Sequence, residues 1–463
     1  MTARTPTQRR SAFLTLALSA ALLLGCSDDS GSVHTVFVLS TPRERYQASL
    51  EEAGLHQTAL ARDWMALGER SLEHSTTVQV PYAELRFLDP SGASAVSYRV
   101  GLERGQRLAV RVEPTEPPTD LRLFMDLFYV SAESEELGLV WSADSLAWEI
   151  DYIAQRPGDY IVRVQPELLR GGRFSVTVSA HASLGFPVAG HSLGSVRSRF
   201  GVARDGGRRE HHGLDIFARR GTPVLAAVAG RARPSTNGLG GTVVWLRDSK
   251  TGQNLYYAHL DRWAFDRSRW VEPGDTIGFV GNSGNARTTP PHLHFGVYLR
   301  GVGAVNPWPH LYEPTERPQE FTGDHGWVGQ GARVAQRRAV LREAPSTGAR
   351  TIRELARHTS LVIVSGSGRW YRVRLPDLSE GYVAAAATEL LDEPTGIMMV
   401  AGGSRVLSSP SAIAGARDTV VTGEMLPVLG TYAGYTFVET NDGVQGWVRS
   451  GALEPTVGPT TNN

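Results

Sequence analysis

The sequence predicts a mainly β, multidomain protein. Its 463 residues correspond to about three domains of ordinary size. Fifty glycines and 26 prolines favour many turns between short strands. The last third of the chain contains an internal repeat, which sets the architecture there. We therefore expect an N-terminal helical segment, a β-sandwich, a third β domain and two small C-terminal β-barrels.

The composition excludes several classes of protein. Apolar residues make up 41% and charged residues 20% of the chain, as in a globular rather than a disordered protein. Lys+Arg and Asp+Glu both number 47, so the basic excess of a nucleic-acid binder is missing, and we expect no nucleic-acid partner. Cys26 is the only cysteine, which excludes an internal disulfide and a cysteine-rich zinc site. Any metal site must use histidines and carboxylates.

Residues 1–25 have the layout of a secretory signal peptide. Three arginines precede a largely apolar run over residues 12–24, which is too short to span about 30 Å of hydrocarbon as a helix. The sequence LLGC that ends at Cys26 resembles a bacterial lipobox. The resemblance implies cleavage before Cys26 and acylation of its thiol, which leaves residues 26–40 as a polar tether to a membrane. An ordinary signal peptide with an incidental cysteine is the alternative.

Residues 41–75 are expected to be helical. Thr41, Pro42 and Glu44 have the pattern of a capping box with proline in the first turn. Apolar residues at helical spacing follow and are interrupted at Gly54. This pattern predicts two short helices, over about 42–53 and 56–72.

Residues 76–182 are expected to form an antiparallel β-sandwich. Apolar and other residues alternate in four short segments that glycines separate, over 96–100, 108–112, 160–164 and 174–178. Residues 156–164 are similar to the last hairpin of bacterial pre-peptidase C-terminal sandwiches. An accessory role is favoured for this domain, and a carbohydrate-binding role is the alternative.

The C-terminal repeat has an offset of 65 residues and needs no gap. Corresponding pairs are Pro345 and Pro410, Trp370 and Tyr435, Gly381 and Gly446, and Val383 and Val448. The two copies, 331–392 and 395–456, resemble the bacterial SH3-like module, a small β-barrel common in cell-wall proteins. A linker over 313–330 precedes them, and its length would let the pair either target the third domain or cover its groove.

Two histidine clusters lie in the segment between the sandwich and the linker. Along a strand, side chains at i and i+2, or at i and i+4, share a face. In the motif HHGLD (211–215) this places His211 and Asp215 on one face, and in HLH (292–294) it does the same for His292 and His294. Two imidazoles and a carboxylate can make a three-ligand zinc site with an open position for water. The spacing does not choose between His292 and His294.

These clusters belong to a longer ordered pattern. It contains HxGxD at 211–215, YAHL at 257–260 and HLHF at 292–295. In combination the motifs are specific, and over about 184–312 the pattern resembles the lysostaphin/LytM family of zinc endopeptidases. The resemblance implies an antiparallel β-sheet core of the duplicated hybrid motif type, with a zinc ion in a groove. In this sequence TPP (289–291) stands where TGP is common before HLH, which bears on substrate fit.

The resemblance also assigns roles to single residues. It implies that His211, Asp215 and His294 bind one Zn²⁺ per chain, while His259 and His292 form the catalytic pair. His292, alone or with His259, would be the general base, and the other histidine would hydrogen-bond the oxyanion. Tyr256 or Tyr257 would assist.

The function implied is that of a metalloendopeptidase that hydrolyses peptide cross-links of peptidoglycan, with a zinc-activated water attacking the scissile carbonyl. The lipobox and the SH3-like pair favour a lipid-anchored protein of the cell envelope. Ser27 resembles an outer-membrane address, so we expect a protein that faces the periplasm and cuts D-Ala–diaminopimelate rather than glycyl cross-bridges. The sequence identifies no regulatory partner.

Two other functions are weighed against this one. A non-catalytic wall-binding or activator protein predicts the loss of ligand residues, and none of the five positions is lost. A secreted protease acting on proteins fits less well with a lipid anchor.

Overall fold

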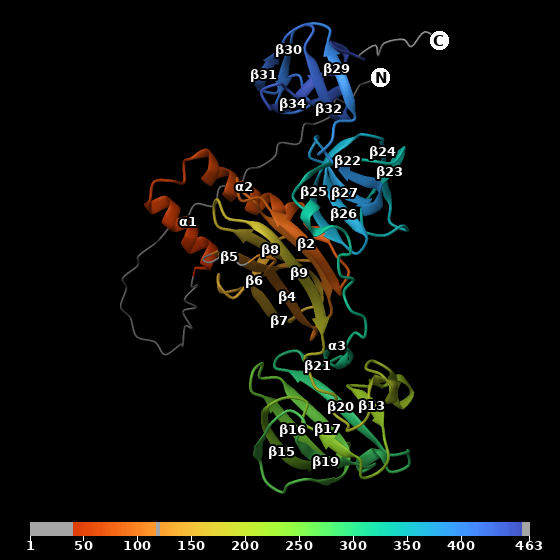
Figure 1. Cartoon of the computed structure of the whole chain (residues 1–463). Helices are drawn as coiled ribbons and strands as arrows, with labels where there is room; N and C mark the ends of the chain where they lie inside the picture. The colour runs from red at the N-terminus through yellow and green to blue at the C-terminus, as the bar shows by residue number, and fades with distance from the viewer. Residues whose placement is uncertain (1–39, 117–120, 456–463) are drawn as a thin grey trace, which may run out of the picture. The chain divides into compact units, whose positions relative to one another are not determined.

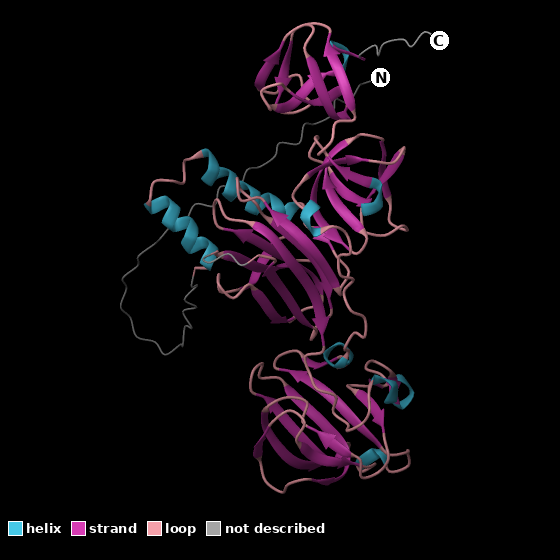
Figure 2. Ribbon diagram, viewed as in Figure 1, coloured by secondary structure: helices cyan, strands magenta, loops and turns pink. Residues whose placement is uncertain are grey.

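The computed structural model describes residues 40–116 and 121–455, whose regular structure is mostly β, as predicted (Figure 2). The predicted signal peptide, Cys26 and nearly all of the tether lie outside the described residues. None of the described helices combines the length and the apolar character needed to cross a membrane.

Two helices precede the first sheet, α1 (Pro42–Glu52) and α2 (Ala59–Glu73) (Figure 1). The predicted capping box is present, because Thr41 Oγ1 accepts from the backbone N–H of Glu44 and the Glu44 carboxylate accepts from that of Thr41. α2 begins later than predicted, because Thr58 caps it by accepting from the Ala61 N–H at 3.2 Å. Trp64 anchors α2 on the sheet, since its ring is fully buried and donates to the Pro166 carbonyl at 2.8 Å.

The next domain is the predicted β-sandwich. One sheet has the strand order β1-β3-β8-β5-β6, and the other contains β2-β9-β4-β7. The strands are β1 (Thr76–Thr77), β2 (Tyr82–Leu88), β3 (Val96–Leu102), β4 (Arg107–Pro114), β5 (Leu123–Val130), β6 (Leu137–Ser142), β7 (Glu149–Ile153), β8 (Gly158–Pro166) and β9 (Gly172–His181). The four segments predicted from alternation lie in β3, β4, β8 and β9, and their apolar side chains fill the core between the sheets.

The third domain, over about 184–312, is an antiparallel β domain with a core of its own. Its main sheet has the order β10-β13-β20-β17-β16-β15-β18, with β14, β19 and β21 paired to it, and a small hairpin, β11–β12, lies outside this sheet. The elements are β10 (Val196–Ser198), β11 (Ala203–Arg204), β12 (Arg209–Glu210), β13 (Leu214–Phe217), β14 (Pro223–Leu225), β15 (Gly230–Asn237), β16 (Gly241–Asp248), β17 (Asn254–Trp263), β18 (Arg269–Val271), β19 (Thr276–Val280), β20 (His292–Leu299), β21 (Gly303–Val305) and α3 (Trp308–Leu311).

Two seven-stranded repeats make up the C-terminal part of the described chain. The first consists of β22 (Gly331–Val334), β23 (Arg338–Arg342), β24 (Thr351–Ala356), β25 (Ser360–Ser367), β26 (Trp370–Arg374), β27 (Glu380–Ala384) and β28 (Thr388–Leu390). The second consists of β29 (Gly396–Val400), β30 (Ser404–Leu407), β31 (Ala416–Val420), β32 (Met425–Tyr432), β33 (Tyr435–Glu439), β34 (Gln445–Arg449) and β35 (Leu453–Pro455). The 65-residue offset of the sequence recurs in the structure, since β25 and β32, β26 and β33, and β27 and β34 begin 65 residues apart.

Strand β2 belongs to the sandwich and also completes the first repeat. Leu85 and Arg86 pair with β25 of that repeat, and Leu85 is buried in the repeat's own hydrophobic core. The sandwich sheet and the first repeat therefore share one hydrogen-bonded sheet. The predicted linker over 313–330 is also partly packed, because Arg173 donates to the Val328 carbonyl at 2.7 Å and Phe321 lies on the Tyr371 ring.

Glu84 accepts the buried side-chain hydrogen bonds at this junction. It is 2% exposed, and its carboxylate accepts from Tyr82 at 2.9 Å, from Ser365 of the repeat at 2.8 Å and from Tyr98. We predict that Glu84→Ala lowers the free energy of unfolding by about 3–5 kcal/mol, because three buried hydroxyls lose their acceptor. Urea unfolding would measure the loss.

An exposed glutamate on β4, Glu113, provides the matched control, and Glu113→Ala should change stability by less than about 0.5 kcal/mol. The sandwich and the first repeat should unfold in one transition. A Glu84→Ala loss under about 1 kcal/mol, or separate transitions in the unmodified chain, would contradict the shared junction.

A second junction joins the sandwich to α3. The His310 ring is 3% exposed and lies against Gly105, whose φ of +89° and close contact leave no room for a Cβ atom. Burial, together with the positive charge of Arg104, lowers the pKa of His310 to about 4. The imidazole is therefore neutral in the folded protein at neutral pH.

This histidine should make the folded protein sensitive to acid. Between pH 6.5 and about 4 the unfolded chain binds a proton at His310 that the folded chain does not, so stability falls as the pH falls through this window. At about 1.4 kcal/mol per pH unit the total is about 3 kcal/mol. We predict that His310→Gln removes this part of the slope in unfolding measured from pH 7 to 4. The exposed His212→Gln should keep the slope, and equal slopes in all three proteins would contradict the prediction.

Candidate metal centre

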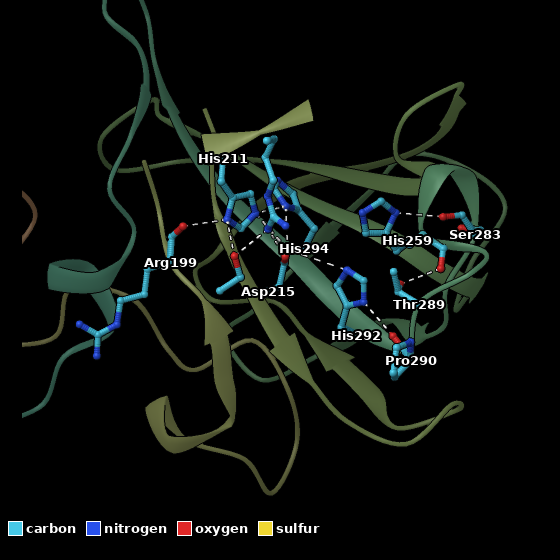
Figure 3. A network of polar contacts seen from close by, with 12 residues as sticks. Arg199, His211, Asp215, His259, Ser283, Thr289, Pro290, His292 and His294 are labelled. Atoms are coloured by element: carbon cyan, nitrogen blue, oxygen red, sulfur yellow. Dashed lines mark hydrogen bonds and ion pairs between the residues drawn. The ribbon is translucent and has the colours of Figure 1, made fainter. Parts of the chain in front are cut away.

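Three residues on neighbouring segments point to one spot in the third domain (Figure 3). Asp215 on β13 lies opposite His294 on β20 in the antiparallel register. His211 precedes β13, where its backbone N–H donates to the Val202 carbonyl at 2.9 Å. Gly213 lies between His211 and Asp215 in the sequence. A Cβ atom at this position would collide with the His294 ring. The absence of a side chain at 213 therefore leaves room for the cluster.

The donor atoms of this trio are close together. His211 Nε2 lies 2.9 Å from His294 Nδ1 and 3.0 Å from Asp215 Oδ1, and the latter two atoms are 3.1 Å apart. A tetrahedral Zn²⁺ with bonds of about 2.0–2.1 Å has ligand atoms about 3.3 Å apart. The two nitrogens and one oxygen thus fit a zinc ion with small adjustments. They form the metal-type cluster found among the described residues.

Backbone carbonyls fix the orientation of three of the imidazoles. His211 Nδ1 donates to the Arg199 carbonyl at 2.8 Å, His259 Nδ1 to that of Ser283 at 2.9 Å, and His292 Nδ1 to that of Pro290 at 2.9 Å. Each bond places a proton on Nδ1 and leaves the lone pair on Nε2. His211 can therefore ligate a metal through Nε2, and His259 and His292 can each accept a proton there.

His259 and His292 lie beside the trio. Their rings are 5.0 Å apart, and the His259 ring lies 5.9 Å from that of His294. His292 Nε2 is 3.9 Å from Asp215 Oδ1. His259 has a left-handed backbone with φ of +63°, which is uncommon outside glycine and is held here by its N–H bond to the Gly240 carbonyl.

The charges are those that a cation would need. Asp215 is 7% exposed; burial opposes its ionisation, but hydrogen bonds from His211 and His294 hold its pKa well below the usual range. Burial, together with the neighbouring His292 and His294, lowers the pKa of His259 to about 4. Burial also lowers the pKa of His294. The cluster therefore combines the Asp215 carboxylate with His259 and His294, whose pKa values are both lowered.

Comparison with known proteins agrees with this geometry. Residues 209–307, which include all five site residues, match peptidase family M23. The chain contains an M23 peptidase domain. Residues 338–389, in the first C-terminal repeat, match the bacterial SH3 domain.

Several relatives resemble the M23 domain. The L-Ala–D-Glu endopeptidase of Bacillus subtilis is 40% identical over 146 residues, which are 28% of this chain and 44% of the relative. The peptidoglycan DD-endopeptidase ShyC of Vibrio cholerae is 37% identical over 95 residues, 20% of this chain and 21% of the relative. The chain thus spans less than half the length of these curated relatives. The crystallised catalytic domain of lysostaphin from Staphylococcus simulans is 29% identical, covers 25% of this chain and 89% of that domain, and has a TM-score of 0.23.

The M23 domain carries its histidines in a groove of about 1120 Å³. Trp245, Tyr256 and Tyr298 make one aromatic wall, with ring centroids 4.4–6.2 Å apart. Tyr256 also lies 5.9 Å from the His294 ring, and its hydroxyl accepts from Asn237 at 3.0 Å. The five site residues, His211, Asp215, His259, His292 and His294, all line this groove.

Sequence reasoning about this site was correct in part. His292 and His294 both lie at the start of β20 and Leu293 is fully buried, as the alternation predicts. His211 was expected in a strand with Asp215 but lies in the loop before it, and the tertiary fold brings the two together. The expected role of Tyr257 is wrong, because this residue is fully buried and its hydroxyl accepts from the Ala227 N–H in the core.

Two site residues were missed. Ser198 pairs with Asp215 across β10 and β13 and contacts His211 Nδ1 at 3.2 Å. Arg204 reaches from the β11–β12 hairpin to the second oxygen of Asp215 at 2.6 Å. Neither residue belongs to a cluster of metal-type ligands, so residue type and spacing gave no signal for them.

Proposed function

We propose that this chain is a lipid-anchored zinc metalloendopeptidase that hydrolyses peptide cross-links of bacterial peptidoglycan. The observation that carries the proposal is the convergence of His211 Nε2, Asp215 Oδ1 and His294 Nδ1 within 3.1 Å of one another. Two further imidazoles with free Nε2 lone pairs lie beside them in one groove.

The donor set supports zinc over the other common cations. Imidazole nitrogens suit Zn²⁺, whereas Ca²⁺ and Mg²⁺ prefer six or more oxygen ligands. Three protein ligands leave one tetrahedral position open, as in catalytic rather than structural zinc sites. Zinc in such a site supplies a Lewis acid that polarises the scissile carbonyl and lowers the pKa of a bound water to about 7.

The chain's own residues would supply the proton transfers. His292 Nε2 lies on the Asp215 side of the site, so His292 is placed to take the proton of the attacking water as the general base. His259 lies next to His292 with its Nε2 lone pair free, so it is placed to share this proton with His292. The same histidines would return a proton to the leaving amine.

The substrate class is supported by the names of the relatives. One relative is named a peptidoglycan DD-endopeptidase, and two others are named an L-Ala–D-Glu endopeptidase and a DD-carboxypeptidase/endopeptidase. Their names differ in the bond. We propose the D-Ala–diaminopimelate cross-link, because the lipobox and Ser27 favour the outer membrane facing the periplasm.

The SH3 domain supports a location next to the cell wall. Its sheet pairing with the sandwich holds the first repeat in place, so we propose that the repeats position the enzyme on the wall from a fixed base rather than from a loose tether. The acylated Cys26 would hold the whole chain at the membrane.

Digestion of peptidoglycan tests the function and the bond. Residues 27–463 would be incubated with purified sacculi, and the muropeptides would be resolved after muramidase treatment, with the His292→Ala protein as control. DD-cleavage should convert cross-linked dimers into monomers. Release of peptides from the glycan with the cross-links between them intact would instead show L-Ala–D-Glu cleavage. Dimers that survive intact, with no release of peptides, would contradict the endopeptidase proposal.

A secreted protease acting on proteins is the competing enzyme. Casein incubated under the same conditions separates the two, because hydrolysis of casein with intact sacculi would favour that function.

A further inference from the structure

The two oxygens of the Asp215 carboxylate have different partners. Oδ1 faces His211 Nε2 at 3.0 Å and His294 Nδ1 at 3.1 Å, the two other candidate ligands. Oδ2 accepts from Arg204 Nη2 at 2.6 Å. A carboxylate with both oxygens free can bind a metal through one oxygen or through two. Here the second oxygen already has a cationic partner.

Arg204 is itself held in place. The same Nη2 donates to Ser198 Oγ at 2.6 Å, and Ser198 is the cross-strand neighbour of Asp215. Ser198 Oγ also lies 3.2 Å from His211 Nδ1, so Arg204 and Ser198 connect two of the three ligands. The Asp215 side chain is 10% exposed and that of Arg204 is 33% exposed, so solvent only partly screens the pair. The contacts of Arg204 with Ser198 and Asp215 are therefore partly protected from solvent.

We infer that Arg204 is a positioning residue that holds Asp215 Oδ2 away from the metal, so that Asp215 ligates through Oδ1 alone. The inference rests on the proposed zinc site. A single carboxylate oxygen with two imidazoles gives three ligand atoms, and the fourth position then stays open for water. A second carboxylate oxygen would compete for that position.

The inference also assigns a role to the β11–β12 hairpin. This hairpin has glycines with positive φ at 206 and 207 at its turn, and Arg204 is the side chain that ties it to the metal ligands. The hairpin is thus part of the site, although it contributes none of the three ligands.

Cobalt substitution tests the inference with a readout other than hydrolysis. Four-coordinate Co²⁺ absorbs visible light more strongly than five-coordinate Co²⁺, so the spectrum reports how many ligands are bound. The full chain from residue 27 would be stripped with a chelator and titrated with Co²⁺ and, separately, with Zn²⁺. We expect a four-coordinate spectrum for the unmodified chain. Arg204→Ala should give a weaker, five-coordinate spectrum and bind Zn²⁺ with about 10–100-fold lower affinity.

Two further variants sharpen the result. Arg208→Ala removes the same charge from the same hairpin at an exposed position, and its spectrum should equal that of the unmodified chain. Arg204→Lys keeps the charge but has no planar fork to bridge Ser198 and Asp215, so it should fall between the unmodified chain and Arg204→Ala. If Arg204→Ala fails to fold, Ser198→Ala replaces it, with a smaller change expected in the same direction.

The outcomes separate this inference from the proposed function. An unmodified chain that binds neither metal would overturn the zinc site itself. An unmodified chain that binds both metals, with Arg204→Ala equal to it in spectrum and affinity, would overturn only the role of Arg204.

Discussion

Asp215→Ala and His211→Ala are each expected to lose the metal and the activity together. Each substitution leaves only two of three ligand atoms in a cluster whose members lie 2.9–3.1 Å apart. Loss of a direct ligand should weaken Zn²⁺ binding by more than the 10–100-fold typical of outer partners. Hydrolysis of cross-linked muropeptides should fall to background. Metal content per chain after dialysis, measured by mass spectrometry, checks the first part.

The adjacent histidine provides a matched control for this result. His212 is exposed and stacks on Phe200 instead of joining the trio, so His212→Ala should keep the metal. His294→Ala should behave like the Asp215 variant. Full zinc occupancy in His294→Ala would overturn the assignment of that residue as a ligand.

His292→Ala and His259→Ala are expected to keep the metal and lose hydrolysis. Neither residue supplies an atom of the trio, but each presents an Nε2 lone pair beside it because its Nδ1 proton is bound to a backbone carbonyl. Loss of a positioned acid–base group costs about 10²–10⁴-fold in rate. Rates of dimer cleavage, set against zinc content for each protein, measure this separation.

The left-handed backbone conformation of His259 makes asparagine a useful second substitution at this position. Its φ of +63° favours glycine or asparagine, so His259→Asn keeps the local conformation more securely than alanine does. Both variants should lose activity with zinc retained. If His259→Asn kept full activity, the histidine would be a structural rather than a catalytic residue.

The sequence predicted the parts of this fold that depend on local periodicity. Strand alternation placed His292 and His294 on one face and Leu293 in the core, because side chains alternate along any strand. The 65-residue repeat predicted two equivalent modules, and their corresponding strands begin 65 residues apart. Thr41 and Glu44 predicted the start of α1 by a local hydrogen-bonding pattern.

Spacing could not choose the third ligand, and the three-dimensional arrangement favours one of the two. His294 Nδ1 lies 2.9 Å from His211 Nε2, whereas His292 Nε2 lies 3.9 Å from Asp215 Oδ1 and its ring stacks on Phe217. The difference arises from how each ring turns relative to its neighbours. Residue type and alternation carry no information about that rotation.

Contacts between distant segments were beyond sequence reasoning. The pairing of Leu85 with Gly366 joins the sandwich to the first repeat. No local sequence pattern in either strand predicts a pairing partner so distant in the sequence. The same holds for Arg204. From the sequence, a single arginine in a glycine-rich hairpin is expected to be a solvated surface residue, but in the structure it donates to Asp215. Predictions that depend on such contacts required the three-dimensional structure.

Zinc-dependent cleavage tests the central claim most directly, namely that His211, Asp215 and His294 hold a catalytic metal. Zinc would be titrated into chelator-stripped protein of residues 27–463, and the loss of cross-linked muropeptides would be followed at each ratio. We predict no cleavage without zinc and a rise that saturates at about one zinc per chain. Full cleavage by the stripped protein, or none by the protein with one zinc bound, would contradict the claim.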